Sequence, residues 1–435
     1  MKKFDVILLI LGVGIVLALS SVIVFKQFRY SYKDGAAAMQ SGHVLADTEA
    51  DRMGTENTDT NTDMKNADTN PSVEMDENTA ENMNESKDAG VSETKPQSTK
   101  KNLEVNAVPD ESAGEKKTAS KSKKVCLAFA GDIYLSDFVL QAYQKAGNQI
   151  SGVLDDGFRE KIAEADLFVA NEEFPFSDRG TAAKDKQFTF RLPTERVSMF
   201  QELGLDLVTL ANNHALDFGE DALLDTCETL DKADIRYVGA GKNLEEASSP
   251  VILEVNGLKL AFLGATRVMP EYSWAAQKDS AGMFETYNPE ALLRKIQEVR
   301  AVSDYVIVYV HWGVERETTP KDYQRTMGKQ YIDAGADLVI GSHPHVLQGI
   351  EYYQGKPIVY SLGNFIFGSQ IPKTMLLMVN LEEDSMSLKL IPGTSSGGYT
   401  RTLNTEAENT EFFQYMQELS FGITVDEVGN VSDAP

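Results

Sequence analysis

Residues 336–349 read ADLVIGSHPHVLQG. The apolar run that begins this stretch stops at Gly341, and His343 and His345 follow with one residue between them. A short apolar run of this kind indicates a buried strand, and the residues after such a strand lie at the edge of a sheet. Two imidazoles delivered to one edge are a common beginning of a metal site. The stretch therefore predicts a strand of an α/β sheet and a metal-binding edge in the same place.

Histidine is scarce in this chain, with five in 435 residues. Four of the five follow a β-like apolar run, namely His214, His311, His343 and His345, and only His43 does not. Histidines scattered by chance would not gather at strand ends. We therefore expect these four imidazoles to form one site.

The alternation of apolar runs with amphipathic stretches predicts one α/β domain at residues 125–400. Continuous apolar runs favour strands that are covered on both faces. The expected strands are 125–130, 166–170, 206–210, 258–264, 305–310, 337–341 and 358–361. The expected helices are 194–203, 219–233, 288–301 and 321–334. From Thr374 onward we expect a closing antiparallel pair of strands, and residues 401–435 are expected to be a peripheral carboxyl-terminal tail.

The amino-terminal residues 1–33 predict a signal anchor. The segment Val6 to Phe25 is 20 residues long, carries no charge, and has basic residues on both sides. A helix of that length spans a hydrocarbon core of about 30 Å, and it exceeds the apolar region of roughly 7 to 15 residues in a cleaved signal peptide. We expect a single-pass transmembrane helix that places the carboxyl-terminal domain outside the cell membrane. Cleavage near residues 36–38 is the alternative, although these lie well beyond the apolar segment.

Residues 34–124 predict a disordered, acidic, low-complexity linker. No Phe, Tyr or Trp occurs between Tyr32 and Phe129, and Asp, Glu, Asn, Thr, Ser and Lys dominate the composition. Such a segment cannot offset the entropy of ordering by burying apolar area. Its last residues, KKTASKSKK, are basic and offer a contact to an anionic polymer or lipid, with a merely solvated linker as the alternative.

The total composition narrows the classes of partner. A formal net charge of -25 argues against non-specific nucleic-acid binding, which needs a cationic surface to displace counterions. We therefore expect no nucleic-acid partner. Cys126 falls in an expected strand and Cys227 in an expected helix, so the two cysteines do not make a disulfide framework.

Metal-competent side chains follow five separate expected strands, where ligands of α/β proteins gather. These side chains are Asp132, Glu172, Glu173, Asn212, Asn213, His214, Asp217, His311, His343 and His345. Each has an ordinary reading by itself, such as a Gly-Asp turn, a solvated pair of glutamates or a helix-capping asparagine. Together they make a mixed oxygen and nitrogen ligand set that suits Mn, Fe or Zn.

The number of candidate ligands favours two divalent ions. The candidates outnumber the roughly three or four protein ligands that one catalytic ion takes. A two-metal site can hold both the attacking and the leaving oxygen of a displacement. His214 is the candidate for acid–base catalysis, because Asp217 three residues later can bond its ring and set the tautomer.

A series of motifs runs through the domain in a fixed order. They are AGD ending at Asp132, ANEEFPFS ending at Ser177, TLANNHALDFG at 209–219, HWG at 311–313, GADLVIGSHPHVLQGIE at 335–351 and YSLGNFIF at 360–367. This series resembles the bacterial capsule-synthesis CapA family, which is associated with poly-γ-glutamate synthesis and looks like a branch of the calcineurin-like metallophosphoesterases. The resemblance implies a four-layer αββα sandwich with a two-metal site.

The resemblance also implies roles for individual residues. The implied metal ligands are Asp132, Glu173, Asn213, His311, His343 and His345. His214 would protonate or stabilise the leaving group, with Asp217 as its partner. Glu173 is preferred over Glu172 by its match to the family's Asn-x-Glu. In place of the superfamily's Asp-x-His, Asp132 is followed by Ile133 and Tyr134, so one expected ligand of the first metal is missing.

Three functions follow as expectations. The first is a membrane-anchored, extracytoplasmic CapA-like protein of capsule or poly-γ-glutamate biosynthesis or export, with a metallophosphatase-like hydrolase site and membrane-bound polymer synthase subunits as partners. The second is a metal-dependent phosphoesterase or amide hydrolase that acts on another cell-envelope substrate. The third is a non-catalytic subunit of a membrane polymer synthase.

Overall fold

The computed structural model describes residues 123–434. The signal anchor expected at residues 1–33 lies outside the described residues, as does the expected linker up to residue 122. Within the described part, no helix combines the length and the apolar character needed to cross a membrane. Both cysteines are free thiols, as expected from their positions.

The first sheet, which we call the large sheet, has ten strands. Its main path is β17 (Ile423–Val425), β18 (Asn430–Asp433), β15 (Ser385–Ser396), β14 (Gln370–Glu382), β1 (Val125–Ile133), β2 (Leu167–Glu172), β3 (Leu207–Thr209) and β4 (Arg236–Val238). In addition, β13 (Asn364–Ile366) pairs with β1, and β16 (Tyr399–Thr402) pairs with β15. Strands β1 to β4 run parallel to one another, whereas β14, β15, β18 and β17 continue the sheet in antiparallel pairs.

The second sheet has six strands. Their order is β11 (Ile350–Tyr353), β12 (Lys356–Val359), β10 (Leu338–Ser342), β9 (Tyr305–His311), β7 (Leu258–Thr266) and β6 (Val251–Val255). The four central strands are parallel, and the two at the edges are antiparallel to their neighbours. A short pair, β5 (Ala240–Gly241) and β8 (Gly282–Met283), stands apart from both sheets.

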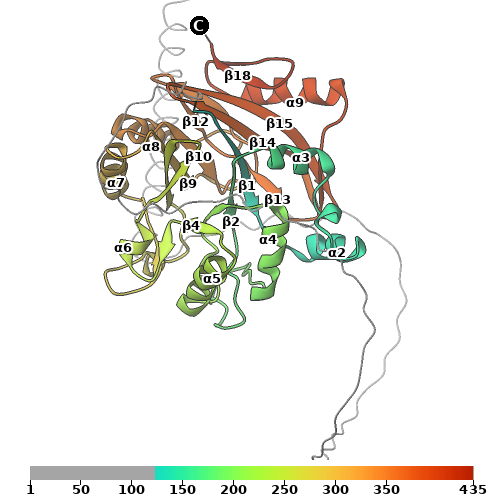
Figure 1. Cartoon of the computed structure of the whole chain (residues 1–435). Coiled ribbons are helices and arrows are strands. Elements are labelled where there is room, and N and C mark those ends of the chain that lie inside the picture. Colours follow the sequence, from blue (N-terminus) through green and yellow to red (C-terminus); the bar gives the residue numbers. More distant parts are fainter. Residues whose placement is uncertain (1–122, 435) are drawn as a thin grey trace, which may run out of the picture. The chain divides into compact units, whose positions relative to one another are not determined.

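Helices other than the carboxyl-terminal one cover the outer faces of the two sheets. The α-helices are α2 (Asp137–Lys145), α3 (Asp156–Glu164), α4 (Val197–Leu203), α5 (Glu220–Lys232), α6 (Leu244–Ala247), α7 (Glu290–Arg300), α8 (Asp322–Ala334) and α9 (Glu406–Leu419). The short 3-10 helices are η1 (Ile150–Gly152), η2 (Thr194–Arg196) and η3 (Tyr272–Trp274). Figure 1 shows α7 and α8 on the left of the sheets and α2, α3 and α4 on the right.

Alternation along the strands explains how the layers pack. In β1, Leu127 and Phe129 face the core between the sheets, whereas Ala128 and Ala130 face the helices. In β9 the same period of two places Ile307 in the inter-sheet core. Side chains of successive strand residues point to opposite faces, so strands that are apolar throughout are buried on both sides. The expected α/β class is confirmed.

The expected elements match the observed ones closely, except at the carboxyl terminus. The antiparallel pair expected after Thr374 is formed by β14 and β15. The expectation that residues 401–435 form a peripheral tail is wrong, because α9 buries Phe412 and Met416 in the inter-sheet core and β18 pairs with β15. The acidic residues of α9 lie away from its buried face. They dominate the composition of the segment, so its apolar residues at helical spacing were not recognised as a core-facing stripe.

Candidate metal centre

The ends of β1 and β2 bring Asp132 and Glu173 together. Asn171 is the register partner of Asp132, and both are fully buried. The Asn171 Nδ2 group donates to Asp132 Oδ1 at 2.8 Å and to Glu173 Oε2 at 3.4 Å. The other oxygens, Asp132 Oδ2 and Glu173 Oε1, are buried without a hydrogen-bond partner. Unpaired buried carboxylate oxygens are costly, so this pair fits a bound cation.

His345 completes this first ligand group. Its Nε2 atom lies 3.8 Å from Glu173 Oε1, and its Nδ1 atom lies 3.5 Å from Asp132 Oδ2. Ligand atoms of the three residues all lie within 4.8 Å of one another. Nδ1 is also 2.8 Å from Oδ1 of Asn364, and donation there leaves Nε2 free to bind a metal ion. Burial lowers the pKa of His345, but Glu173 and Asp132 outweigh burial and raise the pKa to about 10.

A second ligand group contains Glu173, His311 and His343, again within 4.8 Å of one another. His311 ends β9, and its Nε2 atom lies 3.7 Å from Glu173 Oε1 and 2.8 Å from Oδ1 of Asn213. Its Nδ1 atom is held by the Ser342 hydroxyl at 2.9 Å. The Nδ1 atom of His343 is buried without a partner. Burial, followed by neighbouring histidines, keeps the pKa of both imidazoles well below the usual value, so they are neutral and able to bind a metal.

Glu173 is the carboxylate that these two groups have in common. Glu172, the alternative considered from the sequence, belongs to none of the metal-competent groups among the described residues. Its two carboxylate oxygens are buried without a partner, and burial raises its pKa well above the usual value. Burial therefore favours the neutral form of this side chain.

His214 and Asp217 lie together next to the second group. His214 Nδ1 is 2.6 Å from Asp217 Oδ2, and the same oxygen accepts from the Phe190 backbone N–H at 2.6 Å. The imidazole stacks on the Phe190 ring with centroids 4.1 Å apart. Burial lowers the pKa of His214 to about 4, although the bond to Asp217 opposes this shift. His214 is therefore neutral at pH 7, and Asp217 orients its ring.

A family comparison covers the part of the chain that contains these residues. The model of the family described as bacterial capsule synthesis protein PGA_cap matches residues 126–369. The chain belongs to this family. The match contains every predicted ligand, from Asp132 in β1 to His345 after β10, and it confirms the resemblance seen in the motifs.

Two relatives match part of this chain and part of their own length. The PGA biosynthesis protein CapA of Bacillus subtilis (strain 168) is 35% identical over 243 residues, which are 55% of this chain and 62% of that protein. The capsule biosynthesis protein CapA of Bacillus anthracis is 32% identical over 257 residues, which are 57% of this chain and 61% of that protein. The chain thus spans about six-tenths of the length of these two relatives.

Solved structures give distant matches to the PGA_cap chain. A 5'-nucleotidase from Candida albicans SC5314 has a TM-score of 0.36 and 12% identity, and it covers 70% of this chain and 55% of its own. Wild-type Vps29 complexed with Zn+2 from Entamoeba histolytica has a TM-score of 0.24 and 15% identity, and it covers 55% of this chain and 96% of its own.

Lys186 is a member of the PGA_cap site that the sequence reasoning missed. Its Nζ atom contacts Asp217 Oδ1, donates to the Asn213 carbonyl at 2.5 Å, and lies 3.0 Å from His214 Nδ1. The ammonium also lies 5.2 Å from the centre of the Trp274 ring. Burial lowers its pKa more than Asp217 raises it. No sequence pattern predicted that Lys186 belongs to the site, because a lysine in an irregular polar loop is usually exposed to solvent.

Asn212 has a supporting position rather than a ligand position. Its Nδ2 group donates to Asn171 Oδ1 at 3.0 Å and to the Glu172 carbonyl at 2.6 Å, and its Oδ1 accepts from the His214 backbone N–H at 3.0 Å. It therefore ties the loop after β3 to the end of β2. Asn213, the next residue, is the one that faces His311.

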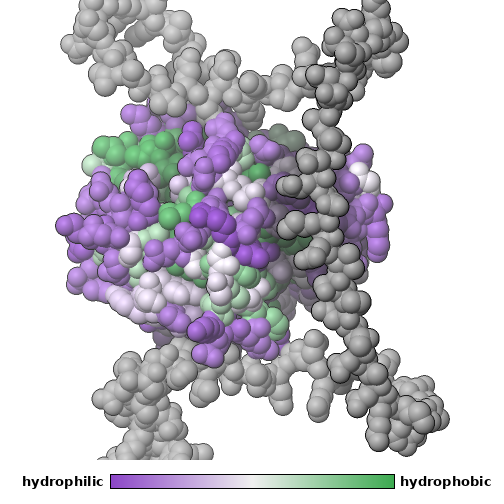
Figure 2. Space-filling view, turned by 90° about the horizontal axis from the view of Figure 1, so that it is seen from below, coloured by the Kyte–Doolittle hydropathy of each residue, from purple (hydrophilic) through white to green (hydrophobic). Residues whose placement is uncertain are grey.

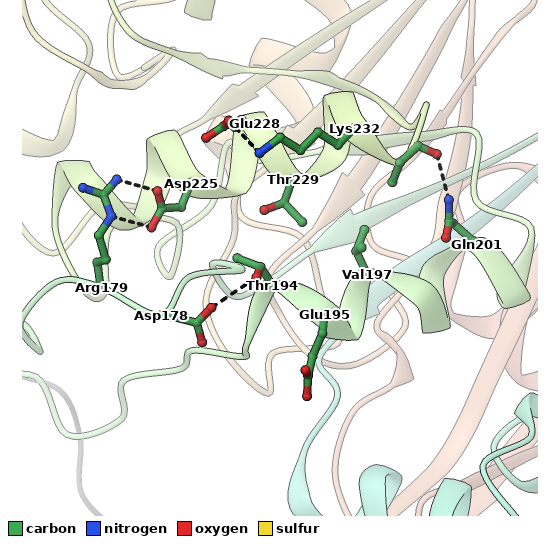
Figure 3. Close-up of a pocket in the computed structure, with 11 residues that line it drawn as sticks. Asp178, Arg179, Thr194, Glu195, Val197, Gln201, Asp225, Glu228, Thr229 and Lys232 are labelled. Carbon is green, nitrogen blue, oxygen red and sulfur yellow. Dashed lines mark hydrogen bonds and ion pairs between the residues drawn. The ribbon is translucent and has the colours of Figure 1, made fainter. Parts of the chain in front are cut away.

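A separate hollow of about 500 Å³ lies between α4 and α5 and contains none of the candidate ligands (Figure 3). Two ion pairs line it, Arg179 with Asp225 and Lys232 with Glu228. Helix α5 lies low in Figure 1. On the face seen from below, hydrophilic residues are interspersed with smaller groups of hydrophobic residues (Figure 2).

Proposed function

We propose that this PGA_cap domain is a metal-dependent hydrolase of capsule or poly-γ-glutamate production, built around two divalent ions that share Glu173. The observation that carries the proposal is the membership of Glu173 in two separate carboxylate and histidine groups. The two Bacillus relatives, which are named for PGA and capsule biosynthesis, supply the polymer context. Mn, Fe or Zn suits this mixture of ligands.

The ligands divide between the two ions. Asp132, Glu173 and His345 would hold one ion, and Glu173, Asn213, His311 and His343 would hold the other. Divalent ions at such a centre supply Lewis-acid polarisation of a carbonyl or phosphoryl oxygen and lower the pKa of an attacking water. The buried oxygens of Asp132 and Glu173 that have no hydrogen-bond partner fit such divalent ions.

The remaining site residues position these ligands and handle a proton. Asn171 holds one oxygen of each carboxylate, so that the second oxygen of each faces the centre. Asp217 orients the imidazole of His214, and a neutral imidazole can take a proton and return it to a leaving group. Lys186 balances the charge of Asp217 and ties the Asn213 carbonyl in place.

The setting proposed for this chemistry is the outer face of the cell membrane. The uncharged segment at residues 6–25 supports a single-pass anchor, and the polar linker after it supports a tethered domain. Membrane-bound polymer synthase subunits are the proposed partners, and an anionic polymer is the proposed substrate.

The test uses the full-length protein in detergent, with metal content measured by elemental analysis. Hydrolysis is followed on poly-γ-glutamate and on a model phosphodiester. We expect metal in the wild type, hydrolysis of the polymer, and a loss of about a hundredfold or more in His214→Ala, with His43→Ala unchanged. Cleavage of the phosphodiester alone would point to a phosphoesterase of another envelope substrate. Metal binding with neither activity would favour a non-catalytic synthase subunit, and a metal-free wild type would overturn the proposal.

A further inference from the structure

Glu315 lies at the candidate metal centre, although it follows no expected strand directly. It sits in the loop after β9, and its carboxylate lies within 4.8 Å of ring nitrogens of both His343 and His345. These two histidines belong to different ligand groups. Unlike the buried Asp132 and Glu173, Glu315 is exposed. It therefore approaches the centre from the solvent side.

The loop that carries Glu315 is fastened to the segment that carries the histidines. The Arg316 backbone N–H donates to the carbonyl of Pro344, between the two histidines, at 2.8 Å. The Trp312 backbone N–H donates to the Ser342 carbonyl at 3.1 Å. Arg316 has a φ of 62°, an uncommon conformation for a residue with a side chain. Bonds on both sides of Glu315 thus fix the distance between its backbone and the histidines.

The charged neighbours of Glu315 lie inside the centre rather than on the surface. Among the described residues, Glu315 forms no ion pair, whereas Glu317 in the same loop pairs with Lys321 at 3.6 Å. Glu315 is close enough to interact electrostatically with Glu173 and Lys186. An ordinary solvated glutamate would lack these relationships to buried groups.

We propose that Glu315 is a further carboxylate ligand of the metal centre, reaching it from solvent between His343 and His345. This inference rests on the proposed function. Glu315 would supply an oxygen ligand to a centre that lacks the histidine of the Asp-x-His motif. At Asp132 this motif has Tyr134 in place of that histidine. A carboxylate on the exposed side can also be displaced by an oxygen of an incoming substrate, while the buried ligands keep the ion in place.

The experiment measures Mn²⁺ binding to the full-length protein by isothermal titration calorimetry. Glu315→Gln keeps the size of the side chain but removes the charge, and we expect it to weaken Mn²⁺ binding by about tenfold or more. The matched control is Glu317→Gln in the same loop, which we expect to change the affinity by less than about twofold. Titrations repeated at 0.5 M salt remove long-range attraction, and the loss in Glu315→Gln should persist there.

The outcomes separate this inference from the proposed function. If the wild type binds Mn²⁺ and Glu315→Gln binds it equally well, Glu315 is no ligand while the proposed metal centre stands. A deficit that disappears at high salt overturns the inference in the same way. If the wild type itself binds no divalent ion, both proposals fail. Circular dichroism of the exposed-site variants verifies that they fold.

Discussion

Glu173 Oε1 lies 3.7 Å from Nε2 of His311, although Glu173 directly follows β2 of the large sheet and His311 ends β9 of the six-stranded sheet. The same buried oxygen lies 3.8 Å from Nε2 of His345. One carboxylate of the large sheet therefore faces imidazoles of the other sheet at two places. Both candidate ligand groups depend on this single side chain.

Replacing Glu173 should empty the centre, whereas replacing its neighbour should not. In Glu173→Gln the shared charge is lost, so we expect the metal content to fall from about two ions per chain to one or none. Glu172→Gln is the matched control, because Glu172 is equally buried but belongs to no metal-competent group among the described residues. Elemental analysis after dialysis against a fixed Mn²⁺ concentration measures both. Equal metal content in the two variants would remove Glu173 from its central position.

Lys186→Met should destabilise the protein because it removes the ammonium group that pairs with the buried Asp217 side chain. The Lys186 side chain is 13% exposed and that of Asp217 is 0% exposed. Loss of one partner of a buried pair costs about 3 kcal/mol in the free energy of unfolding. The exposed pair of Lys242 and Glu246 provides the control, since Lys242→Met should leave this free energy nearly unchanged. Urea unfolding at pH 7 measures both, and similar values would show that Lys186 contributes no more than a surface charge.

Glu351 should make stability depend on pH in the acid range. Burial raises the pKa of Glu351, but hydrogen bonds from Arg325, Lys329 and Tyr360 outweigh it and lower the pKa to about 2 from 4.5. A carboxyl group with a depressed pKa stabilises the folded state above its unfolded pKa, and the contribution is lost as the pH falls through the folded value. The stability difference between wild type and Glu351→Gln should therefore be constant from pH 7 to about 5 and shrink between about pH 4.5 and 2. Denaturant unfolding across this range measures it, and a difference independent of pH would contradict the ionic account.

Phe412→Ala should show that the carboxyl-terminal helix belongs to the core. The Phe412 side chain is 1% exposed and packs among residues of the inter-sheet core. Truncating a buried phenylalanine costs about 3 to 5 kcal/mol in the free energy of unfolding. Val428→Ala, at a residue that is 54% exposed, should cost less than about 0.5 kcal/mol. Thermal or urea unfolding distinguishes them, and a wild-type-like Phe412→Ala would restore the reading of this segment as peripheral.

The sequence by itself determined the α/β class, the positions of the main parallel strands and the gathering of polar residues at their ends. These features are local. Consecutive apolar residues predict a strand, and the polar residue that follows them predicts where the strand ends. The apolar run before Gly341 predicted β10, and the histidines after it predicted a metal-binding edge of the sheet. Family motifs added the order of the ligands.

Only the tertiary structure decided which of these residues meet. It placed Glu173 between His311 and His345, brought Lys186 from an irregular loop onto Asp217, and set Glu315 beside two histidines. It also drew α9 into the core between the sheets. These contacts join residues far apart in the chain through loops without periodicity, so no local pattern encodes them. Their geometry arises only when the two sheets pack and align the carboxyl ends of their strands.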